Sequence, residues 1–167
     1  MESLLFELIC RILHRNQSLL SIAISQRAKF EGWLKFELAS ELKKLYKDTR
    51  VEEPVKGFHI DIHSNQSLIE LKTPNTSYKT KGCDDRICTI TDNINGIISD
   101  INKLSAIVPG LYNNGYIAFV MFPIGNNDRY RVHINKIQKS LGSSPVTYQG
   151  LEVVAGFNTY VFVAKVF

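Results

Sequence analysis

The sequence has 167 residues, enough for one domain that buries a core of its own. Hydrophobic residues make up 44% of it and charged residues 22%, a balance that excludes an intrinsically disordered chain. The net charge of +4 permits contact with nucleic acid but does not indicate it, because a solvated surface with a few extra lysines carries the same charge.

The amino-terminal region is predicted to be helical. Apolar residues recur at helical spacing over residues 2–14, and residues 18–25 follow as a short second helix. A membrane-surface helix is the alternative for residues 2–14, but the polar face lacks a basic cluster, so packing against a core is favoured. Charged residues interrupt the apolar run and no cleavage-site pattern follows it. We therefore expect a cytoplasmic protein without a signal peptide or a membrane span.

The three cysteines, Cys10, Cys83 and Cys88, do not indicate the disulfide framework of a secreted protein. A zinc site needs about four soft ligands, and no second cysteine pair complements Cys83 and Cys88. Free thiols in a reducing compartment are expected.

Residues 28–47 give the clearest helix of the sequence. Its apolar stripe consists of Phe30, Leu34, Leu38, Leu42 and Leu45. Glu31, Glu37 and Glu41 lie on or beside this stripe, and a helical wheel does not separate them. Three lysines near the carboxyl end complement the helix dipole.

After Asp48 the periodicity changes from that of a helix to that of a strand. Residues 50–54 are predicted as a strand, and residues 58–63 and 68–72 as a hairpin with one polar and one apolar face. Residues 73–89 contain Pro74, Gly82 and many polar side chains, which predicts a long loop.

The second half of the chain is predicted to add one helix and more strands. An amphipathic helix begins at residue 90 and is ended by Pro109 and Gly110, and residues 115–123 read as a strand buried on both faces. The remaining elements are a turn at 125–128, a short strand at 130–134, and closing strands at 151–157 and 160–166. This order predicts an α/β fold, a mixed central sheet with helices packed against it.

Three charged residues of the hairpin suggest metal chemistry. Glu70 and Lys72 are two apart on one strand, so their side chains share a face, and Asp61 lies on the polar face of the preceding strand. If the strands pair in the expected register, all three converge. Two carboxylates and a backbone carbonyl suit a hard cation such as Mg²⁺, and a neighbouring lysine can position a water molecule.

The pattern of Asp61 in HIDIH, followed by Glu70-Leu71-Lys72 in LIELKT, resembles the PD-(D/E)XK nuclease superfamily. Members place a glutamate on the helix before the meander, in a stretch like WLKFEL, and a helix and a buried strand after the lysine. Some carry an acidic residue before the aspartate strand, as Glu53 is here. The similarity covers about residues 28–123, in order and spacing more than in letters. One departure is Ile60, which stands where the motif has proline.

The resemblance implies a restriction-endonuclease-like fold for residues 1–167, with residues 1–26 as a helical amino-terminal extension. It implies a phosphodiesterase that cuts DNA with Mg²⁺ or Mn²⁺. Asp61, Glu70 and the carbonyl of Leu71 would hold the metal, and Lys72 would position the attacking water. Glu37, with Glu41 and Glu31 as its substitutes, would support the metal through water. A homodimer is plausible because cutting both strands usually pairs two active sites.

Other interpretations of these residues remain open. His59, Asp61 and His63 form an H-x-D-x-H alternation that could hold a transition metal, although that leaves Glu70 and Lys72 without a role. A nuclease-like fold that binds nucleic acid or a protein without cutting is the main alternative function.

The loop 73–89 provides candidate contacts to nucleic acid. Its basic side chains Lys79, Lys81 and Arg86 suit phosphate groups, and Tyr78 could stack on a base. A merely solvated loop would have a similar composition.

Overall fold

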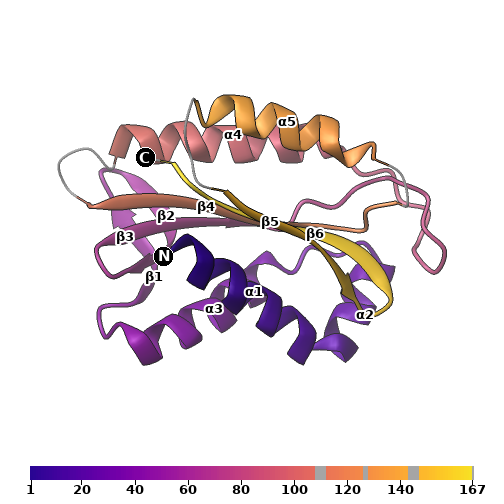
Figure 1. The fold of residues 1–167 in the computed structure, drawn as a ribbon, viewed down its shortest axis with the longest axis horizontal. Helices are drawn as coiled ribbons and strands as arrows, with labels where there is room; N and C mark the ends of the chain where they lie inside the picture. Colours follow the sequence, from indigo (N-terminus) through magenta and orange to yellow (C-terminus); the bar gives the residue numbers. More distant parts are fainter. Residues whose placement is uncertain (108–111, 126–127, 143–146, 167) are drawn as a thin grey trace.

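A six-stranded mixed sheet runs through the middle of the computed structural model, which describes residues 1–107, 112–125, 128–142 and 147–166. Helices cover both of its faces, so the molecule has three layers (Figure 1). The strand order is β1-β2-β3-β4-β6-β5. The predicted mixed sheet flanked by helices is confirmed.

The strands are β1 (Arg50–Val55), β2 (Phe58–Ser64), β3 (Ser67–Lys72), β4 (Asn114–Met121), β5 (Thr147–Val154) and β6 (Phe157–Lys165). Neighbouring strands pair antiparallel except β3 and β4, which run parallel and therefore need a crossover connection. Helix α4 (Ile90–Ile107) provides it.

Two-residue turns close the hairpins. Asn65 and Gln66 join β2 to β3 with positive φ angles of 50° and 56°, as a turn matching the twist of two strands requires. Ala155 and Gly156 do the same between β5 and β6, at φ angles of 52° and 80°. The predicted turn around Asn65 is confirmed, whereas the last hairpin turns earlier than predicted, so that Phe157 begins β6.

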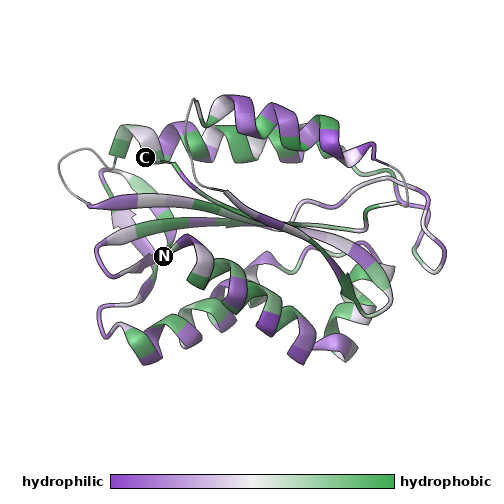
Figure 2. Ribbon diagram, viewed as in Figure 1, coloured by the Kyte–Doolittle hydropathy of each residue, from purple (hydrophilic) through white to green (hydrophobic). Residues whose placement is uncertain are grey.

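Three helices cover one face of the sheet: α1 (Glu2–Arg15), α2 (Gln17–Ser25) and α3 (Glu31–Leu45). Their apolar stripes form one cluster with the inward side chains of the sheet, and Figure 2 shows these apolar surfaces turned inward. Leu5, Ile9 and Ile12 of α1 are fully buried, and each such side chain stabilises the fold by about 2 kcal/mol. The predicted amino-terminal extension is thus, in space, part of the layer that covers the sheet.

Helix α4 and helix α5 (Tyr130–Ser140) cover the opposite face and form a second apolar cluster. The prediction of a short strand at 130–134 is wrong, because this segment lies within α5. Tyr130, Ile134 and Ile137 are buried at helical spacing, while Val132 is 70% exposed. The alternation of Tyr130, Val132 and Ile134 matches the period of a strand, which is why the sequence predicted one.

The loop between β3 and α4 is held in place by a buried arginine. Arg27, 3% exposed, donates hydrogen bonds to the carbonyl oxygens of Thr76, Tyr78 and Asp84. Five guanidinium donors can satisfy several carbonyls at once, which a loop without internal strand pairing requires. The predicted loop at 73–89 is confirmed, but it is anchored to the layer of α1, α2 and α3.

Two smaller predictions lie outside the described residues. Pro109 and Gly110, expected to end α4, fall in the segment 108–111, and residues 126–127 of the predicted turn are also not described. Across the described ranges, none of the helices has the length and apolar character needed to cross a membrane.

Candidate functional site

The strands β2 and β3 bring Asp61 next to Glu70 and Leu71. Their ladder includes the pair Ile62↔Ile69, which directs the next residues, Asp61 and Glu70, toward each other. The Asp61 side chain accepts the backbone N–H of Leu71 through Oδ2 at 2.9 Å. The aspartate therefore sits where β2 and β3 separate, fixed by the backbone of the neighbouring strand.

The other oxygen of Asp61 meets a lysine from helix α3. Lys35 Nζ lies 3.3 Å from Asp61 Oδ1 and also pairs with Glu52 of β1. The Lys35 side chain is only 11% exposed, so the ion pair is shielded from solvent more than a surface pair would be.

Glu70 is the most buried charged side chain of the hairpin, at 2% exposure. Its Oε1 lies 2.6 Å from Lys103 Nζ of α4, so this buried oxygen has the ammonium group as its ion-pair partner. Burial raises the pKa of Glu70 to about 8; the Lys103 ammonium opposes this rise, and the carboxylates of Asp61 and Asp100 add to it.

Lys72, at the end of β3, reaches two carboxylates from different helices. Its ammonium lies 3.3 Å from Glu31 Oε1 of α3 and 3.3 Å from Asp100 Oδ2 of α4. Burial alone would lower the pKa of Lys72, but Asp100 and Glu31, followed by Asp61 and Glu70, outweigh it and raise the pKa above its ordinary value. Lys72 is therefore charged at neutral pH.

These ion pairs form two groups at the carboxyl end of β3, one around Lys35 and one around Lys72 and Lys103. The Asp61 carboxylate of the first group acts electrostatically on Glu70 and Lys72 of the second, and we name the two groups together the charged cluster. It consists of Glu31, Lys35, Glu52, Asp61, Glu70, Lys72, Asp100 and Lys103. Five carboxyl groups face three ammonium groups, so the charged cluster has a formal charge of −2. The predicted residues Asp61, Glu70 and Lys72 all belong to it.

The helix glutamate in the charged cluster is Glu31, not Glu37. Glu31 also accepts the N–H of Thr73 at 3.3 Å. Glu37 instead pairs with Arg15 of α1 at 2.8 Å, as Glu41 does at 3.0 Å. Residues 31 and 35 share one side of the helix, whereas residue 37 is about half a turn away from 35, so Glu37 cannot reach Asp61 from its position.

The donor set of the charged cluster fits a hard cation in its chemistry. Asp61, Glu70 and the Leu71 carbonyl are oxygen donors of the kind that Mg²⁺ takes, and Glu70 presents a buried oxygen that lacks a hydrogen bond. Within the described ranges, however, no three His, Cys, Asp or Glu side chains are grouped closely enough to hold a metal ion. The carboxylates are grouped around lysines instead.

The histidines beside Asp61 do not join the charged cluster through their rings. His63 packs edge-on against Tyr112, with ring centroids 5.5 Å apart. His59 contributes its carbonyl oxygen, which accepts a hydrogen bond from Lys103 at 3.3 Å. Nothing in these contacts favours the H-x-D-x-H metal site.

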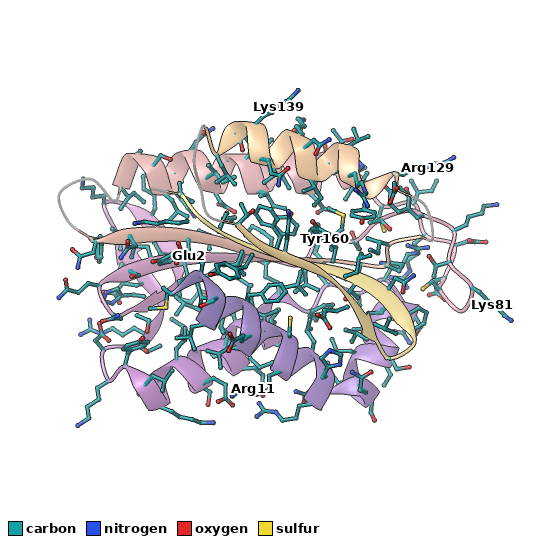
Figure 3. All side chains as sticks on the ribbon, in the orientation of Figure 1. Glu2, Arg11, Lys81, Arg129, Lys139 and Tyr160 are labelled. Atoms are coloured by element: carbon teal, nitrogen blue, oxygen red, sulfur yellow. The ribbon has the colours of Figure 1, made fainter. Side chains whose placement is uncertain are left out.

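The four loop residues considered for nucleic acid are dispersed. Lys79 and Lys81 border a hollow of about 410 Å³ beside Phe157, and Lys81 projects outward (Figure 3). Tyr78 packs partly against the second apolar cluster. Arg86 lies 3.8 Å from Asp84. Lys79 and Lys81 are thus the better placed for an anionic ligand.

Sequence reasoning missed four members of the charged cluster: Lys35, Glu52, Asp100 and Lys103. A signal was present, since Lys35 is one helical turn from Glu31, and Asp100 and Lys103 are three apart on an amphipathic helix. Such pairs are ordinary on solvated helix faces, so only the packing of α3 and α4 against the sheet singles them out.

Comparison of the chain with protein-family models, with characterised proteins and with solved structures gives no match.

Proposed function

We propose that the protein is a metal-dependent nuclease of the PD-(D/E)XK type that hydrolyses phosphodiester bonds in DNA. The observation that carries the proposal is the meeting of Asp61, Glu70 and Lys72 in one partly buried charged cluster. The element order α3-β1-β2-β3-α4-β4 supports it because it is the order that the resemblance implies.

The chain's own residues have separable roles in this proposal. Asp61, Glu70 and the Leu71 carbonyl would hold Mg²⁺ or Mn²⁺, which polarises a phosphate and lowers the pKa of a bound water. Lys72 stays protonated between Glu31 and Asp100, so it donates hydrogen bonds and cannot accept a proton. Its role is to position the attacking water and to stabilise charge developing on the phosphate.

A second candidate is a binding module on a nuclease-like fold. The observation that favours it is the neutralisation of the carboxylates by lysines: Asp61 by Lys35 and Glu70 by Lys103. In this alternative the charged cluster joins the sheet to α3 and α4, and Lys79 and Lys81 contact the partner.

A cleavage assay separates the two candidates. Plasmid and branched DNA are incubated with Mg²⁺ or Mn²⁺ and the wild type, Lys72→Ala, or the control Lys139→Ala, which changes an exposed lysine on α5 (Figure 3). We expect cleavage by the wild type and the control, and a loss of about a thousandfold in Lys72→Ala, because charge stabilisation and water positioning each contribute orders of magnitude. Circular dichroism checks folding. Cleavage retained in Lys72→Ala refutes the mechanism, and no cleavage by the wild type on any DNA favours the binding module.

A further inference from the structure

Lys103 of α4 is a largely buried lysine whose ammonium group is surrounded by oxygen atoms. It lies 2.6 Å from Glu70 Oε1 and 3.2 Å from Asp100 Oδ1, and it donates a hydrogen bond to the carbonyl oxygen of His59 at 3.3 Å. The side chain is 17% exposed. One helix and two strands therefore place three oxygens around a single positive charge.

Two carboxylates and a backbone carbonyl around the ammonium group are the kind of oxygen donors that bind a hard cation. Glu70 belongs both to this set and to the expected metal ligands. A divalent cation bound to Glu70 would lie within a few ångströms of the Lys103 ammonium, in partly buried surroundings where like charges repel more strongly than in water. A cation that binds Glu70 Oε1 would take the position that the Lys103 ammonium holds, 2.6 Å from that oxygen.

The formal charge of the charged cluster also favours the binding of a divalent cation. With Lys103 in place and all five carboxyl groups ionised, the charged cluster has a formal charge of −2, which one divalent cation balances. The carboxylates are arranged around lysines. This arrangement also explains why the described parts of the chain contain no group of three side chains placed to hold a metal ion. A cation can be admitted by moving one flexible side chain, because a lysine has four rotatable methylene groups.

We propose that Lys103 is a resident counter-ion that holds Glu70 and Asp100 together in the metal-free protein and leaves Glu70 when a divalent cation binds. Lys103 is thus a positioning residue that acts through Glu70. The inference rests on the proposed function, because it takes Glu70 as a metal ligand. It predicts that Lys103 competes with the metal.

The test compares Mn²⁺ binding to the wild type and to Lys103→Gln, followed by the electron paramagnetic resonance of free Mn²⁺ without DNA. The amide of the variant is polar but carries no charge. We expect the Kd of the variant to fall by about tenfold or more, because a competing charge is removed. Lys136→Gln is the matched control, since this exposed lysine of α5 donates a hydrogen bond to the Asn95 side chain at 2.9 Å and does not belong to the charged cluster. Its Kd should equal that of the wild type.

A second measurement uses the wild type, in case Lys103→Gln does not fold. Lysine side chains carrying ¹³C at Cε are observed by NMR while Mg²⁺ is added, and the Lys103 resonance, assigned from Lys103→Arg, should shift while that of Lys136 stays. A Lys103 resonance that does not move at saturating Mg²⁺ overturns the inference.

The outcomes distinguish this inference from the proposed function. Mn²⁺ binding with equal Kd in the wild type and Lys103→Gln overturns the counter-ion role and leaves the nuclease proposal standing. Failure of both proteins to bind Mn²⁺ overturns the metal site, and both proposals with it.

Discussion

Helix α3 carries ion pairs on two sides, and the two sets differ in their surroundings. On one side Glu31 and Lys35 enter the charged cluster, where Lys35 is 11% exposed. On the other side Glu37 and Glu41 share Arg15, which is 50% exposed. Both sets pair glutamates or aspartates with basic side chains. Contact with the strand ends, through Asp61 of β2 and Lys72 of β3, distinguishes the side that enters the charged cluster from the side that joins α3 to α1.

The surroundings determine what each set can contribute. The ion pair of Arg15 with Glu37 is exposed to solvent, so salt screens it and it adds little to stability, whereas the Glu41 side chain is only 11% exposed. The buried carboxyl of Glu70 is costly when it lacks a partner, so its state depends on Lys103 and on any bound cation. The following predictions test this difference.

The largest effect is expected for Asp61→Ala. Its removal takes away one expected metal ligand and the acceptor of the Leu71 N–H, so cleavage should fall by about a thousandfold or more. Metal affinity should fall with it, while DNA affinity without metal should stay or rise, because a negative charge near phosphate is lost. Arg15→Ala, which removes the ion pairs on the other side of α3, should leave cleavage unchanged. Equal losses in the two variants would contradict the distinction.

The next effect concerns pH and Glu70. The pKa of Glu70 is raised from its ordinary 4.5 to about 8 by burial. Between these values the folded protein keeps a proton that the unfolded chain has released, so the free energy of unfolding decreases as pH rises. The stabilisation is complete below pH 4.5 and is lost through about pH 8. Relative to Glu70→Gln, the wild type should lose about 3 to 5 kcal/mol between pH 4.5 and pH 9. Urea denaturation in EDTA measures this, and parallel pH curves for both proteins would show that Glu70 titrates normally.

A smaller effect on cleavage is expected for substitutions of the glutamates of α3. Glu31→Gln removes one of the two carboxylates that hold Lys72, while Asp100 remains, so cleavage should fall by about tenfold through a misplaced lysine. Glu37→Gln should have no effect on cleavage. The comparison of kcat for the two variants decides which glutamate serves the site. A loss in Glu37→Gln alone would restore the original assignment.

Much of the fold could be predicted because periodicity reflects burial. Phe30, Leu34, Leu38 and Leu42 are buried at helical spacing, and the alternation of Ile60, Asp61 and Ile62 produced a strand. The wrong prediction of a strand at α5 has the same physical origin. The five residues from Tyr130 fit the period of a strand and that of a helix equally well, and Ile137, about one turn further, is the residue that distinguishes the two.

The site could be predicted only where it lies on the hairpin. Asp61, Glu70 and Lys72 follow from strand geometry, since register and alternation are local. The contributions of α3 and α4 depend on how each helix is rotated against the sheet. That rotation places Glu31 inward and Glu37 toward Arg15, and it is set by packing over the whole layer. The lysines opposite the carboxylates could not be read from the sequence for the same reason.

The parallel pairing of β3 with β4 has a consequence for folding. The hairpin of β2 and β3 closes through a two-residue turn, but β3 meets β4 only after the long loop and α4 have been brought round. Closing this longer segment costs more chain entropy, and non-local pairing of this kind tends to form late. Because Asp100 and Lys103 lie in the crossover, Glu70 should spend the early stages of refolding without its counter-charge. Pulsed hydrogen exchange during refolding should find the hairpin amides protected before those of β4, with Asp61, Glu70 and Lys72 assembled first and Asp100 and Lys103 arriving with α4.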